Sequence, residues 1–464
     1  MLRPRRIAMH FTSLAVNDPS GLSFGNAPRP VELPNGTVIG RDSVVPELNF
    51  TLPPMEVNAA TRAEVVGQYH QIVTGALERC RALHQTDVVF ELETLLEMTL
   101  DPSLGTEIVA TMRSLCDDAE AKEGIRATIR LTPNDTRDFD RPVRMRTSRH
   151  LDAMLELFER GARAGGNLLS IESTGGKELH DDALMYCNVR QMVFALAVLG
   201  VRDMRFLWDH IVRIAERTGT LAGGDTACGF ANTAMVLAEN RYIPRVVAAV
   251  DRIASIGRSL VAFEAGATGP DKDCGYEGPF IKAIAGVPIS MEGKTAACAH
   301  FSQVGNIAAA CCDMWSNESV ANQKLLSGMA PTAYLEQLVY DTRLMNGAIA
   351  SNDRATLQRL FVDSDSALDP QAFILAPVNV IPIAAAYVGG SDAVDGTVAA
   401  IETALTLMRS AIADGTLHID DREAEWIDRI EDELATIPRT EDAFVEAMLP
   451  EIDGGAVTLS EYGL

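Results

Sequence analysis

Short apolar runs alternate with helical segments through the middle of the chain, and this alternation restricts the possible folds more than any other feature. Residues 88–92, 127–131 and 167–171 have the composition of buried strands, and residues 260–263 are expected to form a later strand. Strands separated by helices form parallel sheets built from βαβ units. About eight such units fit between residues 60 and 345, so we expect an α/β fold of the TIM (β/α)8 barrel type rather than an open sheet.

Composition divides the chain into three parts. Residues 1–60 are rich in Pro, Gly and Asn and lack helical periodicity, which indicates an N-terminal arm. The barrel is expected over residues 61–345, beginning with an amphipathic helix. Residues 346–464 are expected to form an additional helical, acidic C-terminal appendage. Within residues 421–437, apolar side chains recur every three or four positions, which predicts a helix with one apolar stripe.

The charge balance excludes several classes of partner. The 464 residues include 40 Lys and Arg against 64 Asp and Glu, giving a net charge of −24. Nucleic acids and anionic lipid surfaces are bound by clustered basic side chains, so we expect neither as a partner. Residues 411–464 hold 15 acids and 3 Arg, and so carry 12 of the 24 excess negative charges. This acidity predicts a solvated helical surface, with a docking face for a partner as the alternative.

No segment has the pattern of a targeting signal or a membrane span. The longest uncharged apolar run, residues 372–390, contains Pro377 and Pro382 and is more typical of a buried segment. The eight Cys are too few for a disulfide framework in a chain of this length. We therefore expect a cytoplasmic protein with reduced thiols.

Three Gly-rich polar stretches follow expected strands, and each carries a potential metal ligand: Glu172, Cys228 and Cys274. In a barrel, all βα junctions open on the carboxyl-end face, where active sites are built. Two thiolates and a carboxylate bind Zn²⁺ and leave one tetrahedral position open, as catalytic sites require. The chain has no CxxC pair and no HExxH motif. From spacing alone, a catalytic cysteine and purely structural loop cysteines therefore remain as alternatives to zinc.

Further polar residues lie beside these candidate ligands. Lys177, Asp225 and Glu277 are candidates for acid, base or orienting roles. His180 and His300 are weaker candidates for orienting the ligands from outside. Nucleotide hydrolysis has no support, since the Gly-Lys-Thr at residues 293–295 lacks the earlier Gly that a phosphate-binding loop needs.

The three stretches together resemble the methanol-specific corrinoid methyltransferases, the zinc subunits that work with a separate corrinoid protein in methanol-using archaea and anaerobic bacteria. The resemblance extends over most of the chain. It rests on GGDTACGFANT at residues 223–233, CGYEGP at residues 274–279 and IES at residues 171–173. It implies a TIM barrel with extra helices, a zinc ion held by Glu172, Cys228 and Cys274, and a homodimer that binds the corrinoid protein over the barrel mouth.

The resemblance also implies an activity, which is transfer of the methyl group of methanol to cobalt(I) of a corrinoid on the partner, as in methanogenesis or other methylotrophy. Hydroxide is a poor leaving group, and zinc acting as a Lewis acid on the oxygen lowers the cost of its departure. Two thiolates weaken that Lewis acidity, so a nearby donor should compensate, and Lys177 is the candidate. No His follows an Asp by two positions, as is typical of corrinoid-binding domains, so the corrinoid should arrive on the partner.

Two other functions stay open. One is a zinc-dependent corrinoid demethylase that acts on a different methyl donor, such as a methyl ether or methylamine. The other is a non-enzymatic subunit of a complex, in which the Cys-Gly loops are only structural. Metal content separates the two enzymes from the non-enzymatic subunit, and a methyl-donor assay separates the methyltransferase from the demethylase.

Overall fold

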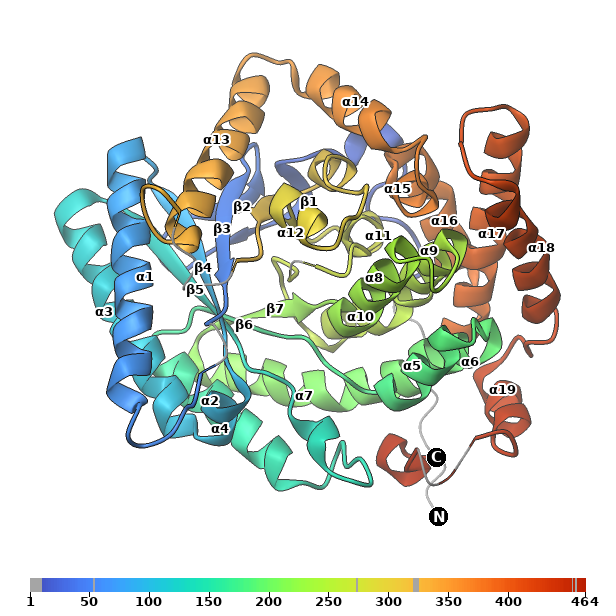
Figure 1. The fold of residues 1–464 in the computed structure, drawn as a ribbon, viewed down its shortest axis with the longest axis horizontal. Helices are drawn as coiled ribbons and strands as arrows, with labels where there is room; N and C mark the ends of the chain where they lie inside the picture. Colours follow the sequence, from blue (N-terminus) through green and yellow to red (C-terminus); the bar gives the residue numbers. More distant parts are fainter. Residues whose placement is uncertain (1–10, 53–54, 273, 320–324, 453, 455–456) are drawn as a thin grey trace.

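A curled sheet of parallel strands stands at the centre of the fold, and helices surround it (Figure 1). The computed structural model describes residues 11–52, 55–272, 274–319, 325–452, 454 and 457–464. Across the sheet the strands follow the order β7-β6-β5-β4-β3-β9-β8. They are β3 (Val45–Phe50), β4 (Asp87–Glu93), β5 (Arg126–Thr132), β6 (Leu168–Ile171), β7 (Leu221–Asp225), β8 (Ser290–Glu292) and β9 (Met314–Ser316).

Residues 268–271 occupy the position between β7 and β8, where a closed barrel has its eighth strand. On one side, the backbone N–H of Thr268 donates to the carbonyl oxygen of Ala222 in β7, with N and O 2.9 Å apart. On the other side, the N–H of Asp271 donates to the carbonyl oxygen of Pro288, just before β8, at 2.8 Å. Backbone hydrogen bonds thus continue around the ring through an irregular segment. The expected barrel-type α/β fold is confirmed.

The N-terminal region is more than an arm. It forms the hairpin β1 (Asn26–Glu32) and β2 (Val38–Arg41), and then β3, which pairs with β4 and β9 in the central sheet. All six residues of β3 are buried, but they include Pro46, Glu47 and Asn49, so the segment does not have the apolar run expected of a buried strand. The expected start of the barrel at residue 61 is therefore wrong. Residues 1–10 and 53–54 of the expected arm lie outside the described residues.

The strand expected at residues 260–263 is also wrong. These residues belong to α10 (Ile256–Ala265), in which every residue from Ile256 to Phe263 is buried. A helix buried on all sides has no polar face, so a short apolar run within it cannot be told from a strand by periodicity. The residues at the eighth-strand position come directly after this helix.

Helices between the strands cover the outside of the sheet. The amphipathic helix expected at residue 61 is confirmed as α1. Two π-helical segments, η3 (Ala195–Gly200) and η4 (Cys228–Asn232), run directly into the helices that follow them. The other helices as far as residue 350 are α1 (Arg62–Leu83), α2 (Leu96–Leu100), α3 (Pro102–Glu123), α4 (Arg149–Arg163), α5 (Lys177–Met185), α6 (Val189–Phe194), α7 (Val201–Thr218), α8 (Thr233–Glu239), α9 (Arg245–Ala254), α11 (Gly278–Ala285), α12 (Lys294–Ala299) and α13 (Ala330–Ala350).

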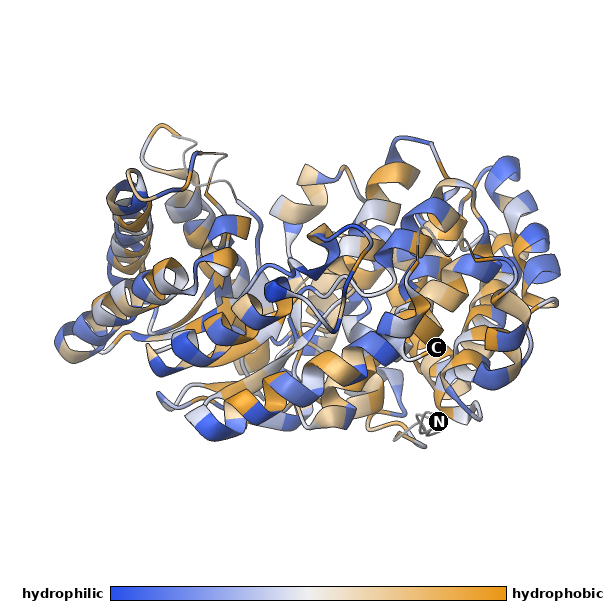
Figure 2. Cartoon of the chain, turned by 90° about the horizontal axis from the view of Figure 1, so that it is seen from below, coloured by the Kyte–Doolittle hydropathy of each residue, from blue (hydrophilic) through white to orange (hydrophobic). Residues whose placement is uncertain are grey.

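The C-terminal helices pack against one side of this barrel, beside α6, α9 and α11. In α18 the side chains of Ile427, Ile430 and Leu434 are buried, which confirms the predicted apolar stripe. Figure 2 shows apolar faces turned inward along these helices. The helices are α14 (Arg354–Asp365), α15 (Pro370–Leu375), α16 (Pro377–Gly389), α17 (Ala393–Ala413), α18 (Asp421–Leu434) and α19 (Glu441–Met448).

Part of the C-terminal acidity is used inside the molecule. The Glu423 carboxylate accepts hydrogen bonds from the backbone N–H groups of Arg245 and Val246, at 3.0 and 3.1 Å, and so caps α9. The Glu441 carboxylate accepts from Arg202 in α7 at 2.7 Å. These acids therefore attach the appendage to the barrel. Residues 372–390 form α15 and α16, and no described helix is long and apolar enough to cross a membrane.

Candidate metal centre

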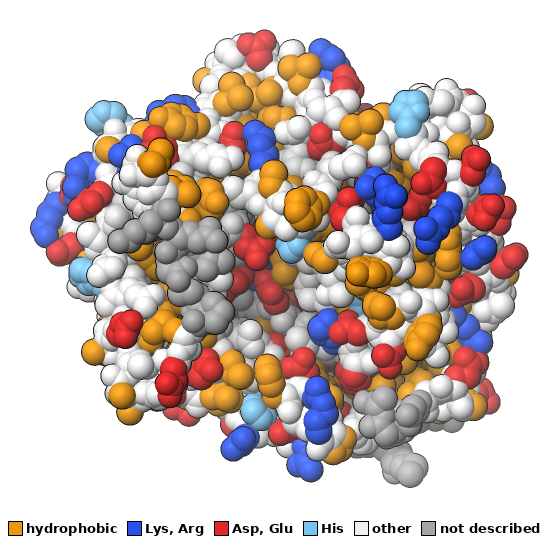
Figure 3. All heavy atoms as spheres, in the orientation of Figure 1, with side chains coloured by type: hydrophobic (Ala, Val, Ile, Leu, Met, Phe, Trp, Pro, Cys, Tyr) orange, Lys and Arg blue, Asp and Glu red, His pale blue; other side chains and the backbone are white. Residues whose placement is uncertain are grey.

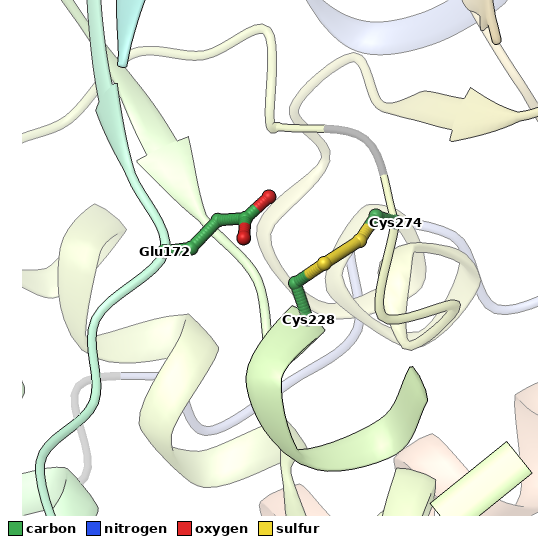
Figure 4. Close-up of side chains that lie close together, drawn as sticks. All are labelled: Glu172, Cys228 and Cys274. Atoms are coloured by element: carbon green, nitrogen blue, oxygen red, sulfur yellow. A yellow bond between two sulfur atoms is a disulfide. The ribbon is translucent and has the colours of Figure 1, made fainter. Parts of the chain in front are cut away.

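Glu172, Cys228 and Cys274 come together at the carboxyl ends of the strands (Figure 4). Glu172 directly follows β6, Cys228 begins η4 just after β7, and Cys274 lies in the loop that leads into α11. A carboxylate oxygen and the two Sγ atoms lie within 4.8 Å of one another. The structure thus brings together the three residues that the sequence predicts as metal ligands.

The two cysteines are joined by a disulfide, with Cα atoms 5.4 Å apart. Metal ligation needs thiolates, so a metal would bind here only after this bond is reduced. The Glu172 carboxylate points toward the sulfur pair (Figure 4). Two sulfur donors and one oxygen donor on a single centre match a zinc site that keeps one position for substrate. The residues present therefore fit a zinc ion.

A left-handed stretch of backbone aims Cys274 at Cys228. Cys274, Gly275 and Tyr276 have φ angles of 68°, 69° and 58°, a conformation that non-glycine residues rarely adopt. Arg252, buried in α9, donates from its guanidinium to the carbonyl oxygen of Gly275 at 2.8 Å and lies 4.9 Å from the centre of the Tyr276 ring. Arg252 thus holds the loop in this conformation. It was not among the expected site residues, because nothing in the sequence of its helix marks it.

Glu277 and Asp225 connect the segments that carry the ligands. The buried Glu277 carboxylate accepts from the backbone N–H of Ala227, the neighbour of Cys228, at 2.7 Å, and so joins the two cysteine segments. Asp225 accepts from the N–H of Ser173, the neighbour of Glu172, at 3.3 Å. Burial raises the pKa of Asp225 to about 6 and also raises the pKa of Glu277. Each carboxyl therefore binds the backbone of a residue that is adjacent in sequence to a candidate metal ligand.

Lys177 opens α5 beside the site. Its Nζ lies 2.8 Å from Asp181 Oδ1 and 2.8 Å from the carbonyl oxygen of Gly229, which follows Cys228. The ammonium also lies 5.7 Å from the centre of the Phe230 ring. Its charge is therefore directed at Asp181 and at the backbone of η4.

Lys272 was not singled out from the sequence, yet it makes the most direct contact with a ligand carboxylate. Its fully buried Nζ lies 2.9 Å from Glu172 Oε1, 2.9 Å from Glu91 Oε1 and 3.0 Å from Glu93 Oε1. Glu91 and Glu93 alternate in β4 and so project from one face of the strand. Two acids at that spacing, directly after the apolar residues 88–90, were the available sign of a buried cation. Asp273, next to Lys272, lies outside the described residues.

A cavity of about 260 Å³ opens beside Glu172 at the ends of β4, β5 and β6. Its walls include Glu93, Thr132, Asp135 and Gly229. Figure 3 shows acidic side chains gathered in a hollow near the centre of this face of the molecule. Pockets for drug-sized ligands measure about 300–1,000 Å³, so this cavity suits a smaller substrate.

The C-terminal end of the chain supports the loop after Glu172. The Tyr462 hydroxyl accepts from the backbone N–H of Gly176 at 2.9 Å and donates to Glu178 Oε1 at 2.8 Å. The appendage thus contacts the loop that follows Glu172 and the start of α5.

The two histidine candidates have different surroundings. His180 is fully buried, with Nε2 2.7 Å from Asp251 Oδ1 and Nδ1 3.3 Å from Asp181 Oδ1. Burial lowers the pKa of His180, but the two carboxylates raise it by more, so the pKa lies above its ordinary value. The Nε2 atom of His300 lies 3.4 Å from Glu318 Oε2.

This raised pKa predicts a pH-dependent stability. The protonated His180 contributes stability fully below the unfolded-state pKa of about 6.5, and this contribution is lost as pH rises through the higher folded-state pKa. We expect His180→Gln to lower the free energy of unfolding most below pH 6.5, and progressively less above it. Urea unfolding of both proteins across this range measures the difference. Asp251→Asn should flatten the same pH dependence, whereas a difference that does not change with pH contradicts the prediction.

Comparisons with known proteins agree with this geometry. Residues 8–463 match the model of a family described as the methanol-cobalamin methyltransferase B subunit. A methanol–corrinoid protein co-methyltransferase from Methanosarcina barkeri is 36% identical over 388 residues, which cover 83% of this chain and 84% of the relative. A chain in the crystal structure of the methanol:cobalamin methyltransferase complex from Methanosarcina barkeri matches with a TM-score of 0.94 and 32% identity, over 98% of this chain and 99% of that one.

Proposed function

The chain belongs to the methanol-cobalamin methyltransferase B subunit family, and we propose that it transfers the methyl group of methanol to the cobalt of a corrinoid on a partner protein, using zinc held by Glu172, Cys228 and Cys274. The observation that carries the zinc assignment is the convergence of these two sulfurs and one carboxylate at the barrel mouth. Resemblance to the family and a donor set that fits zinc support the same conclusion.

Zinc bound there would supply a Lewis acid to the oxygen of methanol, which lowers the cost of releasing hydroxide. Lys272 holds the Glu172 carboxylate in place. The cavity beside Glu172 is large enough to admit a small alcohol. We assign orienting roles to Asp225 and Glu277, because each binds the backbone next to a ligand.

Lys177 receives a similar role in the proposal. Its ammonium binds the carbonyl oxygen of Gly229 and so fixes the first turn after Cys228. This contact supports an orienting function rather than direct donation to the sulfurs.

The corrinoid partner would approach over the barrel mouth, where the ligands lie. Exposed apolar side chains on the segments after β6 and β8 support this docking face: Met185, Tyr186 and Phe301. A homodimer is part of the proposal through the family resemblance, and the mass of the protein in solution tests it. Thiolate ligands need a reducing compartment, which supports a cytoplasmic location.

The test mixes reduced, zinc-loaded protein with free cobalt(I) cobalamin and follows the visible spectrum after methanol is added. We expect the cobalt(I) bands to decay and the bands of methylcobalamin to grow, in proportion to methanol and only when zinc is present. Unchanged cobalt(I) with methanol, together with its consumption by methylamine or a methyl ether, would establish the demethylase alternative instead. Unchanged cobalt(I) with every donor would remove the enzymatic proposal.

A further inference from the structure

The side-chain amide of Asn232 contacts both cysteine sulfurs of the metal centre. Its Nδ2 lies 3.3 Å from Cys228 Sγ and 3.0 Å from Cys274 Sγ, the two sulfurs of the disulfide. Cys228 and Asn232 are the first and last residues of η4, so a single helical turn brings the amide back over the sulfur. The π-helical widening of that turn is a feature often found at functional sites.

The orientation of this amide is determined by the sulfurs. Nδ2 carries two N–H donors, whereas sulfur is an acceptor. Oδ1 of Asn232 is buried and has no hydrogen-bond partner among the described residues. A flipped amide would set its acceptor oxygen against two acceptor sulfurs and lose both bonds.

These contacts matter for a bound metal because of the net charge of the three ligands. Two thiolates and a carboxylate carry one more negative charge than a divalent cation neutralises, and this surplus weakens the metal as a Lewis acid. Hydrogen bonds to sulfur withdraw part of that charge, and they strengthen when the acceptor is ionised. Lys177, the donor expected from the sequence, directs its ammonium at Asp181 and Gly229 instead.

We propose that Asn232 is a positioning residue whose paired N–H···S bonds draw charge from Cys228 and Cys274 and so set the electrophilic strength of the metal that they bind. This inference rests on the proposed zinc site. The inference concerns the electron density on the two thiolates, and this can be measured without any turnover of methanol.

The experiment replaces zinc by Co²⁺ in the reduced protein, because thiolate-to-cobalt charge transfer gives an absorption band that reports the electron density on sulfur. In Asn232→Leu, which has a similar shape and no donor, we expect this band to move to longer wavelength. Thr233→Val is the matched control, since it removes a side-chain bond to the Gly229 carbonyl oxygen at 3.0 Å in the same turn, and its band should stay in place.

Asn232→Asp provides a second variant of the same shape without an N–H donor, and its band should move in the same direction. Bands unchanged in both variants, with Co²⁺ bound as in the wild type, would overturn the proposal, as would an equal shift in Thr233→Val. A wild-type protein that binds no Co²⁺ would instead overturn the zinc site itself. Thermal melting of the metal-free proteins establishes that each variant is folded before the spectra are compared.

Discussion

We expect the replacement of Cys228 by Ala to abolish stoichiometric zinc binding and, with it, methanol-dependent methylation of the corrinoid. Cys228, Cys274 and Glu172 are the only trio of potential ligand atoms that the described residues bring together. If three ligands share about 10–16 kcal/mol of apparent binding free energy, the loss of one costs roughly 3–5 kcal/mol, on the order of 10²- to 10⁴-fold in zinc affinity. Metal analysis after dialysis and chelator competition measures this loss directly.

Cys298→Ala is the matched control for the loss of a thiol. Cys298 is exposed in α12 and lies outside the ligand trio, so this variant should keep its zinc and its activity. Full zinc content and full activity in Cys228→Ala would contradict the assignment of the site. Both variants are prepared under reducing conditions, because the wild-type pair forms a disulfide.

The candidate ligands were accessible from the sequence because each lies in a short polar stretch at a βα junction. Parallel strands place all such junctions at one end of the sheet, so residues far apart in the chain converge there. Spacing alone left a catalytic cysteine and structural cysteines open, and the family resemblance selected the zinc trio. The structure adds the spatial convergence of Glu172, Cys228 and Cys274 within 4.8 Å.

The parts of the fold that escaped prediction each lack the sequence pattern of their own structure. β3 contains Pro46 and buries the polar residues Glu47 and Asn49, so it lacks the apolar run typical of a buried strand. Residues 256–263 of α10 are buried on all sides, so they show no helical period. Residues 268–271 form backbone hydrogen bonds to β7 and to the residue before β8 without regular strand geometry, so their sequence shows no strand pattern. The strands at residues 88–92, 127–131 and 167–171 were identified because each lies between clear helical segments.

The residues that support the ligands were missed for a different reason. Arg252 and Lys272 act through contacts with residues distant in sequence, and Asn232 through a sulfur that only the fold brings near. A local pattern does not record such contacts. Lys177 was placed beside the site correctly, but its ammonium is engaged by a carboxylate four residues along its own helix.

Replacing Lys272 by Met is expected to lower the free energy of unfolding by about 3–5 kcal/mol, the range for breaking a buried ion pair from one side. The substitution keeps the length of the side chain and removes the one ammonium at the meeting point of Glu91, Glu93 and Glu172. Three carboxylates then face each other without a countercharge, and Glu91 among them is fully buried, whereas the side chains of Glu93 and Glu172 are 29% and 32% exposed. Urea unfolding of the metal-free, reduced protein measures the loss.

Lys282→Met separates the role of Lys272 at the metal centre from its role as a buried charge. Lys282 is equally buried and pairs with Asp313 at 2.9 Å, at the opposite, amino end of β9, so its loss should destabilise the protein to a similar degree. Added zinc restores positive charge next to Glu172 but not next to Asp313. We therefore expect zinc to raise the melting temperature of Lys272→Met more than that of Lys282→Met or the wild type. Equal increases in the three proteins would mean that Lys272 stabilises the fold without acting on the ligand Glu172.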